Sequence, residues 1–213
     1  MHVHCTMMLA PGKEQEVTDL LVESLPIIAR YRWSLAASYR LLSGPTRTLI
    51  NLWEIPDGNA FMAFGEQIAA DPELARIMVG LEDAMTHNEL TLVSRLLEAS
   101  APRAGTDEKA GEVVYVHETV TTRANRFPQV LGLIASAAPL LEKRGIRFVG
   151  SYQRATGPTR MLVNLWELPA AASHAALDEA IAADPELAKI YAAISDHSGS
   201  VERAPMARMP YSP

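Results

Sequence analysis

The chain has 213 residues and a formal net charge of −6, with 48% hydrophobic and 21% charged residues. This balance is typical of a globular protein with a packed core and excludes a mostly disordered chain. Residues 1–100 carry 7 basic and 13 acidic groups, and residues 101–213 carry 12 of each. Neither half has the basic excess that non-specific nucleic-acid binding requires, so we expect no nucleic-acid partner.

The single cysteine, Cys5, rules out an internal disulfide and any site built from several cysteines. The N-terminal residues do not have the pattern of a signal peptide, and no apolar run approaches the roughly 18 residues of a membrane span. We therefore expect a cytoplasmic protein without a membrane partner. The richness in alanine, arginine and proline is typical of a bacterial protein.

The chain repeats itself at an offset of 113 residues. Residues 43–56 read SGPTRTLINLWEIP, and residues 156–169 read TGPTRMLVNLWELP. Without a gap, 30 of the 81 positions from Val3 to Asp83 are identical to the residues 113 positions later. Two copies of one unit are therefore fused head to tail.

The repeat predicts two domains, at residues 1–98 and 112–206. Between them, residues 99–111 are small, polar and charged, which predicts a flexible linker. Residues 207–213 contain two prolines near the end and predict an extended tail.

The first half of each copy is predicted to run strand, helix, strand. The first strand spans about His2–Leu9, and the helix near Gly12–Tyr31 has apolar residues at helical spacing. Pro26 inside this helix predicts a kink or an early end. The next strand spans about Ser34–Leu42.

The second half of each copy is predicted to run strand, helix, strand. A hairpin turn at residues 43–45 leads into a strand at about Thr46–Ile55. The helix after it restarts at Asp71-Pro72, where Asp71 can cap the new turn and Pro72 can take its first position. The last strand lies near Leu90–Leu97, and we match Ser200–Arg203 to it after the loss of about five residues.

The order βαββαβ is that of a ferredoxin-like unit. Both helices of such a unit cover the same side of its sheet, so one sheet face is left bare. Fusing two copies lets the two bare faces meet. We therefore predict an α+β protein, with two tandem ferredoxin-like repeats forming an intramolecular dimeric α+β barrel, as a monomeric pseudo-dimer or a homo-oligomer of it.

Two motifs recur in both copies and resemble the NIPSNAP family of the dimeric α+β barrel superfamily. They are Asn-Leu-Trp-Glu at residues 51–54 and 164–167 and Ala-Asp-Pro-Glu-Leu at residues 70–74 and 183–187. The resemblance implies the fold and leaves the activity open. Relatives in the superfamily include cofactor-free monooxygenases of antibiotic pathways, polyketide cyclases, haem-dependent enzymes and proteins without known catalysis.

Strand parity selects the candidate catalytic residues, because alternate side chains face opposite sides of a sheet. His4 and His117 occupy equivalent positions and can act as bases near neutral pH, can bind a metal or haem iron, or can be hydrogen-bonded core residues. Glu118 replaces Cys5 in the second copy and is a candidate assisting carboxylate. Tyr39 and Tyr152 can orient a phenolic or enolic oxygen, or serve as core aromatics.

The candidate substrate-binding residues lie on and beside the third strand of each copy. They are Asn51, Trp53 and Arg47, with Asn164, Trp166 and Arg160 as their equivalents. The arginines can also be solvated surface residues, and the tryptophans can be core. His2 and His4 have the spacing of a metal pair, but Tyr115 replaces His2 in the second copy, so we expect no metal.

The sequence is consistent with two functions. The first is a cofactor-free enzyme, either a monooxygenase or a cyclase or lyase, acting on a small aromatic or polyketide-like metabolite of secondary metabolism. A base would remove an acidic proton, and hydrogen-bond donors would hold the enolate. The alternative is a non-catalytic NIPSNAP-like protein that binds a small molecule or haem.

Overall fold

The structure is a computed structural model that describes residues 1–98, 114–169 and 175–213, so the predicted linker at residues 99–111 lies outside the described residues. The chain divides into two compact units. The first unit comprises Met1–Val93 together with Met209–Pro213, and the second comprises Ser94–Arg208. No helix among the described residues is long and apolar enough to cross a membrane.

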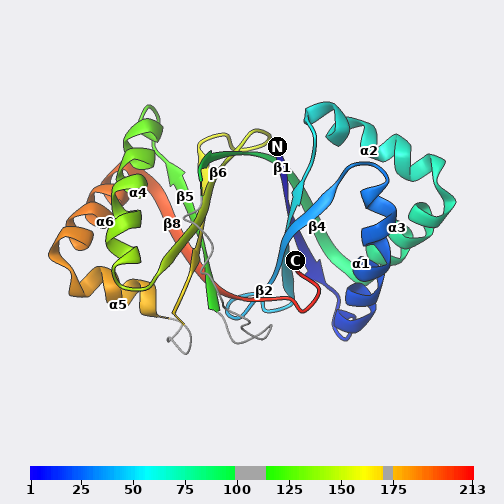
Figure 1. The fold of residues 1–213 in the computed structure, drawn as a ribbon, viewed down its shortest axis with the longest axis horizontal. Helices are drawn as coiled ribbons and strands as arrows, with labels where there is room; N and C mark the ends of the chain where they lie inside the picture. The colour runs from blue at the N-terminus through cyan, green and yellow to red at the C-terminus, as the bar shows by residue number, and fades with distance from the viewer. Residues whose placement is uncertain (99–113, 170–174) are drawn as a thin grey trace. The chain divides into compact units, whose positions relative to one another are not determined.

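The first unit is an antiparallel sheet with its helices on one face (Figure 1). The strands lie in the order β4-β1-β3-β2. The elements, in chain order, are β1 (His2–Leu9), α1 (Glu14–Ala29), β2 (Ser34–Leu41), β3 (Thr48–Glu54), α2 (Gly58–Ala70), α3 (Pro72–Ala84) and β4 (Met85–Leu97). The core lies between the sheet and the helices, where Val3 and Cys5 of β1 pack with Val17 and Leu21 of α1.

The second unit repeats this architecture, with strands in the order β8-β5-β7-β6. Its elements are β5 (Val114–Thr122), α4 (Phe127–Glu142), β6 (Arg147–Arg154), β7 (Met161–Glu167), α5 (Ala176–Ala183), α6 (Pro185–His197) and β8 (Ser198–Arg208). The helices again lie on one face of the sheet (Figure 1). The prediction of an α+β protein with two ferredoxin-like repeats is therefore confirmed.

The restart of the second helix at Asp71-Pro72 is confirmed. The backbone turns to an extended conformation at Asp71 between α2 and α3, and the Asp71 carboxylate accepts hydrogen bonds from the N–H groups of Glu73 and Leu74. Pro72 occupies the first turn, where its missing N–H is not needed. Asp184 caps α6 in the same way.

Two details differ from the predicted elements. The first helix continues past Pro26 and ends at Ala29, within a turn of the proline. The last strand begins earlier than predicted, at Met85 in one unit and at Ser198 in the other. These two positions are 113 residues apart, so the predicted loss of about five residues is wrong and the repeat offset persists through the last strand.

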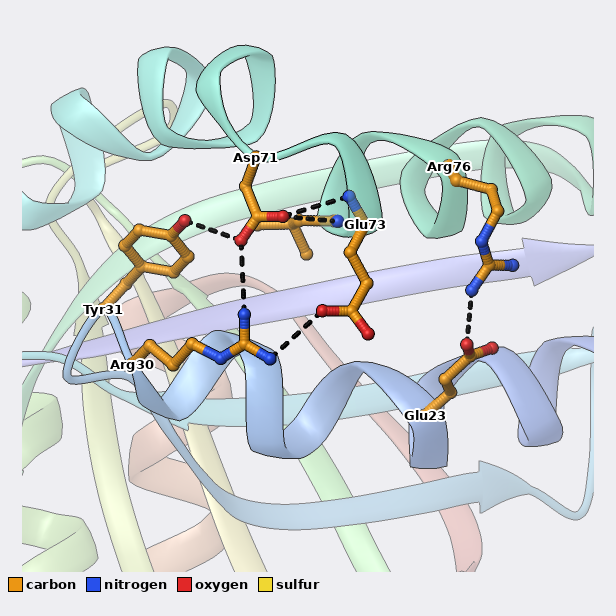
Figure 2. A network of polar contacts seen from close by, with 7 residues as sticks. Glu23, Arg30, Tyr31, Asp71, Glu73 and Arg76 are labelled. Atoms are coloured by element: carbon orange, nitrogen blue, oxygen red, sulfur yellow. Dashed lines mark hydrogen bonds and ion pairs between the residues drawn. The ribbon is translucent and has the colours of Figure 1, made fainter.

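A polar network joins α1 to the junction of α2 and α3 (Figure 2). The Tyr31 hydroxyl donates to the Asp71 carboxylate at 2.9 Å, and Arg30 reaches both Asp71 and Glu73. The Tyr31 hydroxyl is the largest cause that holds the pKa of Asp71 below its ordinary value of 3.8, followed by the N–H of Leu74. The network therefore favours the charged cap.

Replacing Tyr31 with phenylalanine is expected to raise the pKa of Asp71 toward 3.8. Because the folded state lowers this pKa, the cap stabilises the fold above the unfolded pKa, and that stabilisation is lost as the pH falls through the folded value. An NMR titration of the carboxyl carbon measures the shift. Asp184, whose partner is Arg144, is the internal control; an unchanged pKa of Asp71 contradicts the assignment.

Candidate functional site

One row of residues crosses the sheet of the first unit on the face that the helices cover. Cys5 of β1 pairs with Leu90 of β4 on one side and with Asn51 of β3 on the other, and Asn51 pairs with Ser38 of β2. Because neighbours across an antiparallel sheet point to the same face, all four side chains face the helices.

A cavity of about 200 Å³ lies between this row and the helices. Its wall includes Cys5, Asn51 and Trp53 from the sheet, Trp33 from the turn before β2, and Phe64 and Met78 from the helices. Leu90, which also lines the cavity, is 44% exposed, so the cavity reaches solvent beside β4. An engineered apolar cavity of about 150 Å³ binds benzene, so this one has room for a small aromatic molecule.

Two nitrogen donors lie in the cavity wall. Ser38 Oγ donates to Asn51 Oδ1 at 2.6 Å, and Asn51 Nδ2 donates only to the weak acceptor Met7 Sδ at 3.2 Å. The indole N–H of Trp33 is buried and has no hydrogen-bond partner among the described residues. The Trp33 ring stacks on Phe64 with a centroid separation of 4.3 Å. A buried donor without a partner is costly, and an oxygen atom of a ligand can satisfy it.

The thiol of Cys5 is a protonated part of this wall. Burial raises the pKa of Cys5 to about 12. The thiol lies 3.4 Å from the Asn88 side-chain oxygen, to which it donates. A thiol with so high a pKa is a poor nucleophile and a poor base near neutral pH, because the reactive form is the thiolate.

Cys5 is expected to react with a disulfide reagent at pH 8 about 10³-fold more slowly in the folded protein than in the unfolded chain. At that pH a thiol with a pKa of about 12 is almost wholly protonated, whereas an ordinary thiol is partly ionised. Since this is the only cysteine, the release of chromophore from Ellman's reagent, with and without guanidinium, reports on it directly. Equal rates in the two conditions contradict the burial of the thiol.

The equivalent row of the second unit is charged. Glu118 pairs with Arg203 and Asn164, and Asn164 pairs with Ser151. The Glu118 carboxylate is fully buried and accepts hydrogen bonds from Asn164 Nδ2 at 2.9 Å, Trp166 Nε1 at 3.2 Å and Arg203 Nε at 2.8 Å. The charge is therefore fully paired, as a buried carboxylate requires.

Arg203 and Tyr191 occupy the space beside Glu118. The Arg203 guanidinium lies over the Tyr191 ring at 4.9 Å from its centroid and also pairs with Asp178. Three substitutions between equivalent positions distinguish the cavity of the first unit from the filled space of the second. The apolar set of the first unit is Cys5, Met78 and Leu90, and the polar set of the second unit is Glu118, Tyr191 and Arg203.

The structure places the predicted histidines and tyrosines on the other face of each sheet. His4 pairs with Leu52 and Thr91, one register position away from the Cys5 row, and His117 is placed equivalently in β5. His117 Nδ1 lies 3.4 Å from Thr119 Oγ1. Tyr39 shares that face in the first unit, since it follows Ser38. None of these side chains faces the cavity.

Tyr152 lies on the corresponding face of the second unit. Its hydroxyl accepts a hydrogen bond from Arg95 at 2.9 Å, and the guanidinium lies 5.4 Å from the ring centroid. Of the predicted catalytic residues, only Glu118 therefore lies on the helix-covered face, where Arg203 and the two nitrogen donors hold it.

The predicted substrate-binding residues divide by unit. Asn51 and Trp53 line the cavity of the first unit, whereas Asn164 and Trp166 donate to Glu118 in the second. The remaining pair, Arg47 and Arg160, lie in exposed hairpins. Their backbone oxygens accept hydrogen bonds from backbone N–H groups at the end of the first strand of each unit.

Sequence reasoning missed Trp33, Met78 and Leu90 in the first unit and Arg203 in the second. The signal for Leu90 and Arg203 was present in the offset of 113 residues, which aligns them once no gap is introduced. Among the described residues, no group of three or more His, Cys, Asp or Glu side chains could hold a metal ion.

No protein-family model matches the chain, and no curated protein matches it. Solved structures match along the whole chain. A protein described as a candidate monooxygenase from Lactobacillus acidophilus NCFM matches with a TM-score of 0.66 over 100% of this chain and 97% of its own, at 9% identity. An anthrone oxidase-like protein matches with a TM-score of 0.66 over 98% of this chain and 90% of its own, at 11% identity.

A NIPSNAP domain protein from Burkholderia xenovorans matches over 51% of this chain and 100% of its own, at 24% identity and a TM-score of 0.38. The full-length likenesses show the fold. The chain thus has the fold of a protein described as a candidate monooxygenase and of an anthrone oxidase-like protein. At such low sequence identities, a shared fold does not imply a shared activity.

Proposed function

We propose that the chain is a cofactor-free enzyme that acts on a small, flat, hydrophobic metabolite bound in the cavity of the first unit. One observation carries the proposal: an apolar cavity of about 200 Å³ has two side-chain N–H donors, from Asn51 and Trp33, in its wall. Apolar pockets with a few placed polar groups are the usual form of small-molecule sites. The substrate class is an aromatic or polyketide-like compound of secondary metabolism.

The donors favour a substrate that carries negative charge on oxygen during the reaction. In a dry pocket, N–H groups aimed at an oxygen stabilise an enolate or phenolate more than its neutral form. A substrate CH₂ that is next to a carbonyl, or conjugated with one through a ring, loses a proton to give the enolate, whose carbon reduces dioxygen and forms a carbon–oxygen bond; the proton then returns to the peroxide oxygen. Loss of water from the resulting hydroperoxide leaves a carbonyl, so that CH₂ and O₂ become C=O and H₂O.

The proton must leave through a group at the cavity. Glu82 lines it and is exposed, and its carboxylate is the acceptor that we propose. The Cys5 thiol, with a pKa of about 12, is an unsuitable base. Cyclisation or elimination would begin with the same proton transfer.

Oxygen consumption with enolisable aromatic compounds, from hydroxynaphthalenes to anthrones, tests the proposal. Asn51→Ala is expected to lower kcat/KM at least about tenfold, because one donor to the developing oxyanion is lost. The matched variant Asn164→Ala lowers thermal stability but leaves kcat/KM unchanged, since Asn164 serves Glu118. Equal losses in the two variants would contradict a site in the first unit.

A second candidate function is supported by a specific observation. None of the described residues that line the cavity is a histidine, and the cavity has no buried base. A non-catalytic protein that binds a small molecule needs the same cavity and donors but no base. Saturable binding of the aromatic compounds without any turnover would favour this function over the enzyme.

Haem fits this cavity poorly. The cavity volume of about 200 Å³ is too small for a porphyrin, and the described residues of its wall include no axial imidazole. His4 and His117, the candidate haem ligands, lie on the opposite sheet faces. A Soret band in the purified protein would contradict this assignment.

A further inference from the structure

The C-terminal segment Met209–Pro213 belongs to the first unit, although the sequence before it forms the last strand of the second. It binds Ser38 through three separate groups. Met209 N donates to Ser38 O at 2.9 Å, Ser38 N donates to Ser212 Oγ at 2.9 Å, and the hydroxyls of Ser38 and Tyr211 lie 3.1 Å apart. The end of the chain therefore holds one residue of the row that faces the cavity.

The Ser38 hydroxyl has one hydrogen and two oxygen neighbours, so it can donate to only one of them. Asn51 Oδ1 has no hydrogen, so the contact of 2.6 Å between it and Ser38 Oγ uses the single hydroxyl hydrogen of Ser38. Ser38 Oγ must then accept from Tyr211, whose hydroxyl donates across 3.1 Å. Donation thus runs from Tyr211 to Ser38 to Asn51, and the Asn51 amide is held with its oxygen toward Ser38 and its NH₂ group away from it.

The described residues of the second unit do not form this chain of hydrogen bonds. Ser151, the equivalent of Ser38, is fully buried, and its hydroxyl has no hydrogen-bond partner among the described residues. Asn164 Oδ1 is likewise without a partner. Glu98 stands at the position equivalent to Tyr211. The chain of donors is therefore present in the unit that has the cavity and absent from the unit in which Glu118 and Arg203 fill the equivalent space.

We propose that Tyr211 and Ser38 are positioning residues that orient the Asn51 amide so that its N–H recognises an oxygen atom of the bound molecule. The inference rests on the proposed function, since it assigns a role within the same cavity. It makes the C-terminal segment a part of the ligand site of the first unit. The ligand it fits is an aromatic compound with a phenolic or carbonyl oxygen.

Burial keeps this donor chain intact near neutral pH. Tyr211 packs against the core of the first unit, and burial raises the pKa of its hydroxyl above the ordinary value. The hydroxyl therefore stays protonated and able to donate. A phenylalanine at this position retains the packing of the ring and removes only the donor.

Binding of 2-naphthol and of naphthalene, measured by quenching of tryptophan fluorescence, tests the inference. The two ligands differ by one oxygen, so the ratio of their affinities isolates its recognition. Ser38→Ala is expected to reduce the preference for 2-naphthol about tenfold and Tyr211→Phe about threefold, the range for loss of one hydrogen bond. The affinity for naphthalene stays the same in both variants.

The matched control is Ser151→Ala, which removes the hydroxyl that has no partner in the second unit and should leave the preference unchanged. If Ser38→Ala and Tyr211→Phe keep the wild-type preference, or weaken both ligands equally, the positioning role is wrong while the binding site stands. If neither ligand binds the wild-type protein, the proposed function fails and the inference fails with it.

Discussion

Replacing Arg203 with leucine is expected to lower the free energy of unfolding by about 3 kcal/mol, because removing one partner of a buried ion pair leaves an uncompensated charge. Glu118 is fully buried, and Arg203 is its only cationic partner among the described residues. The Arg203 side chain is 23% exposed, so water can reach part of the gap and the loss falls at the lower end of the usual range. For a chain of this size the loss corresponds to a fall of roughly 6–12 °C in Tm.

The double variant Glu118→Cys, Arg203→Leu is expected to recover most of this loss. It installs the residues that the first unit has at the equivalent positions, so no charge is left in the core. Thermal and urea unfolding of the single and double variants measure both effects. If Arg203→Leu is as stable as the wild type, or the double variant is no more stable than the single one, the ion pair does not hold this part of the core.

The reciprocal exchange in the first unit is expected to abolish ligand binding. The triple variant Cys5→Glu, Met78→Tyr, Leu90→Arg places the polar set of the second unit around the cavity. Asn51 and Trp53 stand where Asn164 and Trp166 donate to Glu118, so the new carboxylate finds donors. The tyrosine and arginine then occupy the cavity, and the affinity for 2-naphthol should fall roughly 100-fold or more.

Calorimetric titration measures this loss, and a second triple variant controls for perturbation of the sheet. Cys5→Ala, Met78→Leu, Leu90→Met keeps all three positions apolar and should bind within about threefold of the wild type. If both triple variants bind 2-naphthol like the wild type, the ligand does not occupy this cavity.

The fold was predictable because the two copies give two independent sequences for each structural element. An offset that keeps Gly44-Pro45, Asp71-Pro72 and the Asn-Leu-Trp-Glu strand in both copies fixes where each element begins and ends. The start of the last strand was misplaced because β4 is largely exposed before Leu90, so its apolar alternation is weak there. The burial pattern of β8, the equivalent strand in the second unit, is equally irregular.

The site was predictable only in part, because strand parity says which residues share a face but not which face the helices cover. Parity placed Asn51 and Trp53 on one face of their strand, but the prediction grouped them in one site with His4, which the structure places on the opposite face of the sheet. His4 was chosen as a candidate base because of its chemistry. Because β1 buries Val3, Cys5 and Met7 against the helices, the alternate residue His4 faces the other side of the sheet. The bond between Ser38 and Tyr211 joins residues 173 positions apart, which no local pattern reveals.

The sequence shows that the two units differ in this row of residues, but the consequence of the difference depends on how the side chains pack. The change from Cys5 to Glu118 was visible, but it indicated a free base as readily as a paired one. Only the position of Arg203 directly across the sheet from Glu118 decides between the two. A charged pair at matched cross-strand positions fills the space that two smaller apolar residues leave open in the first unit.

A crystal structure of the protein with 2-naphthol bound would locate the ligand site. We expect one ligand per chain, in the first unit, with its ring against Trp33 and Phe64 and its oxygen within hydrogen-bond distance of the side-chain nitrogen of Asn51 or Trp33. The equivalent place in the second unit should remain filled by Glu118 and Arg203. A ligand bound instead on the sheet faces that carry His4 and His117 would contradict a site in the cavity and would make those histidines the active-site candidates.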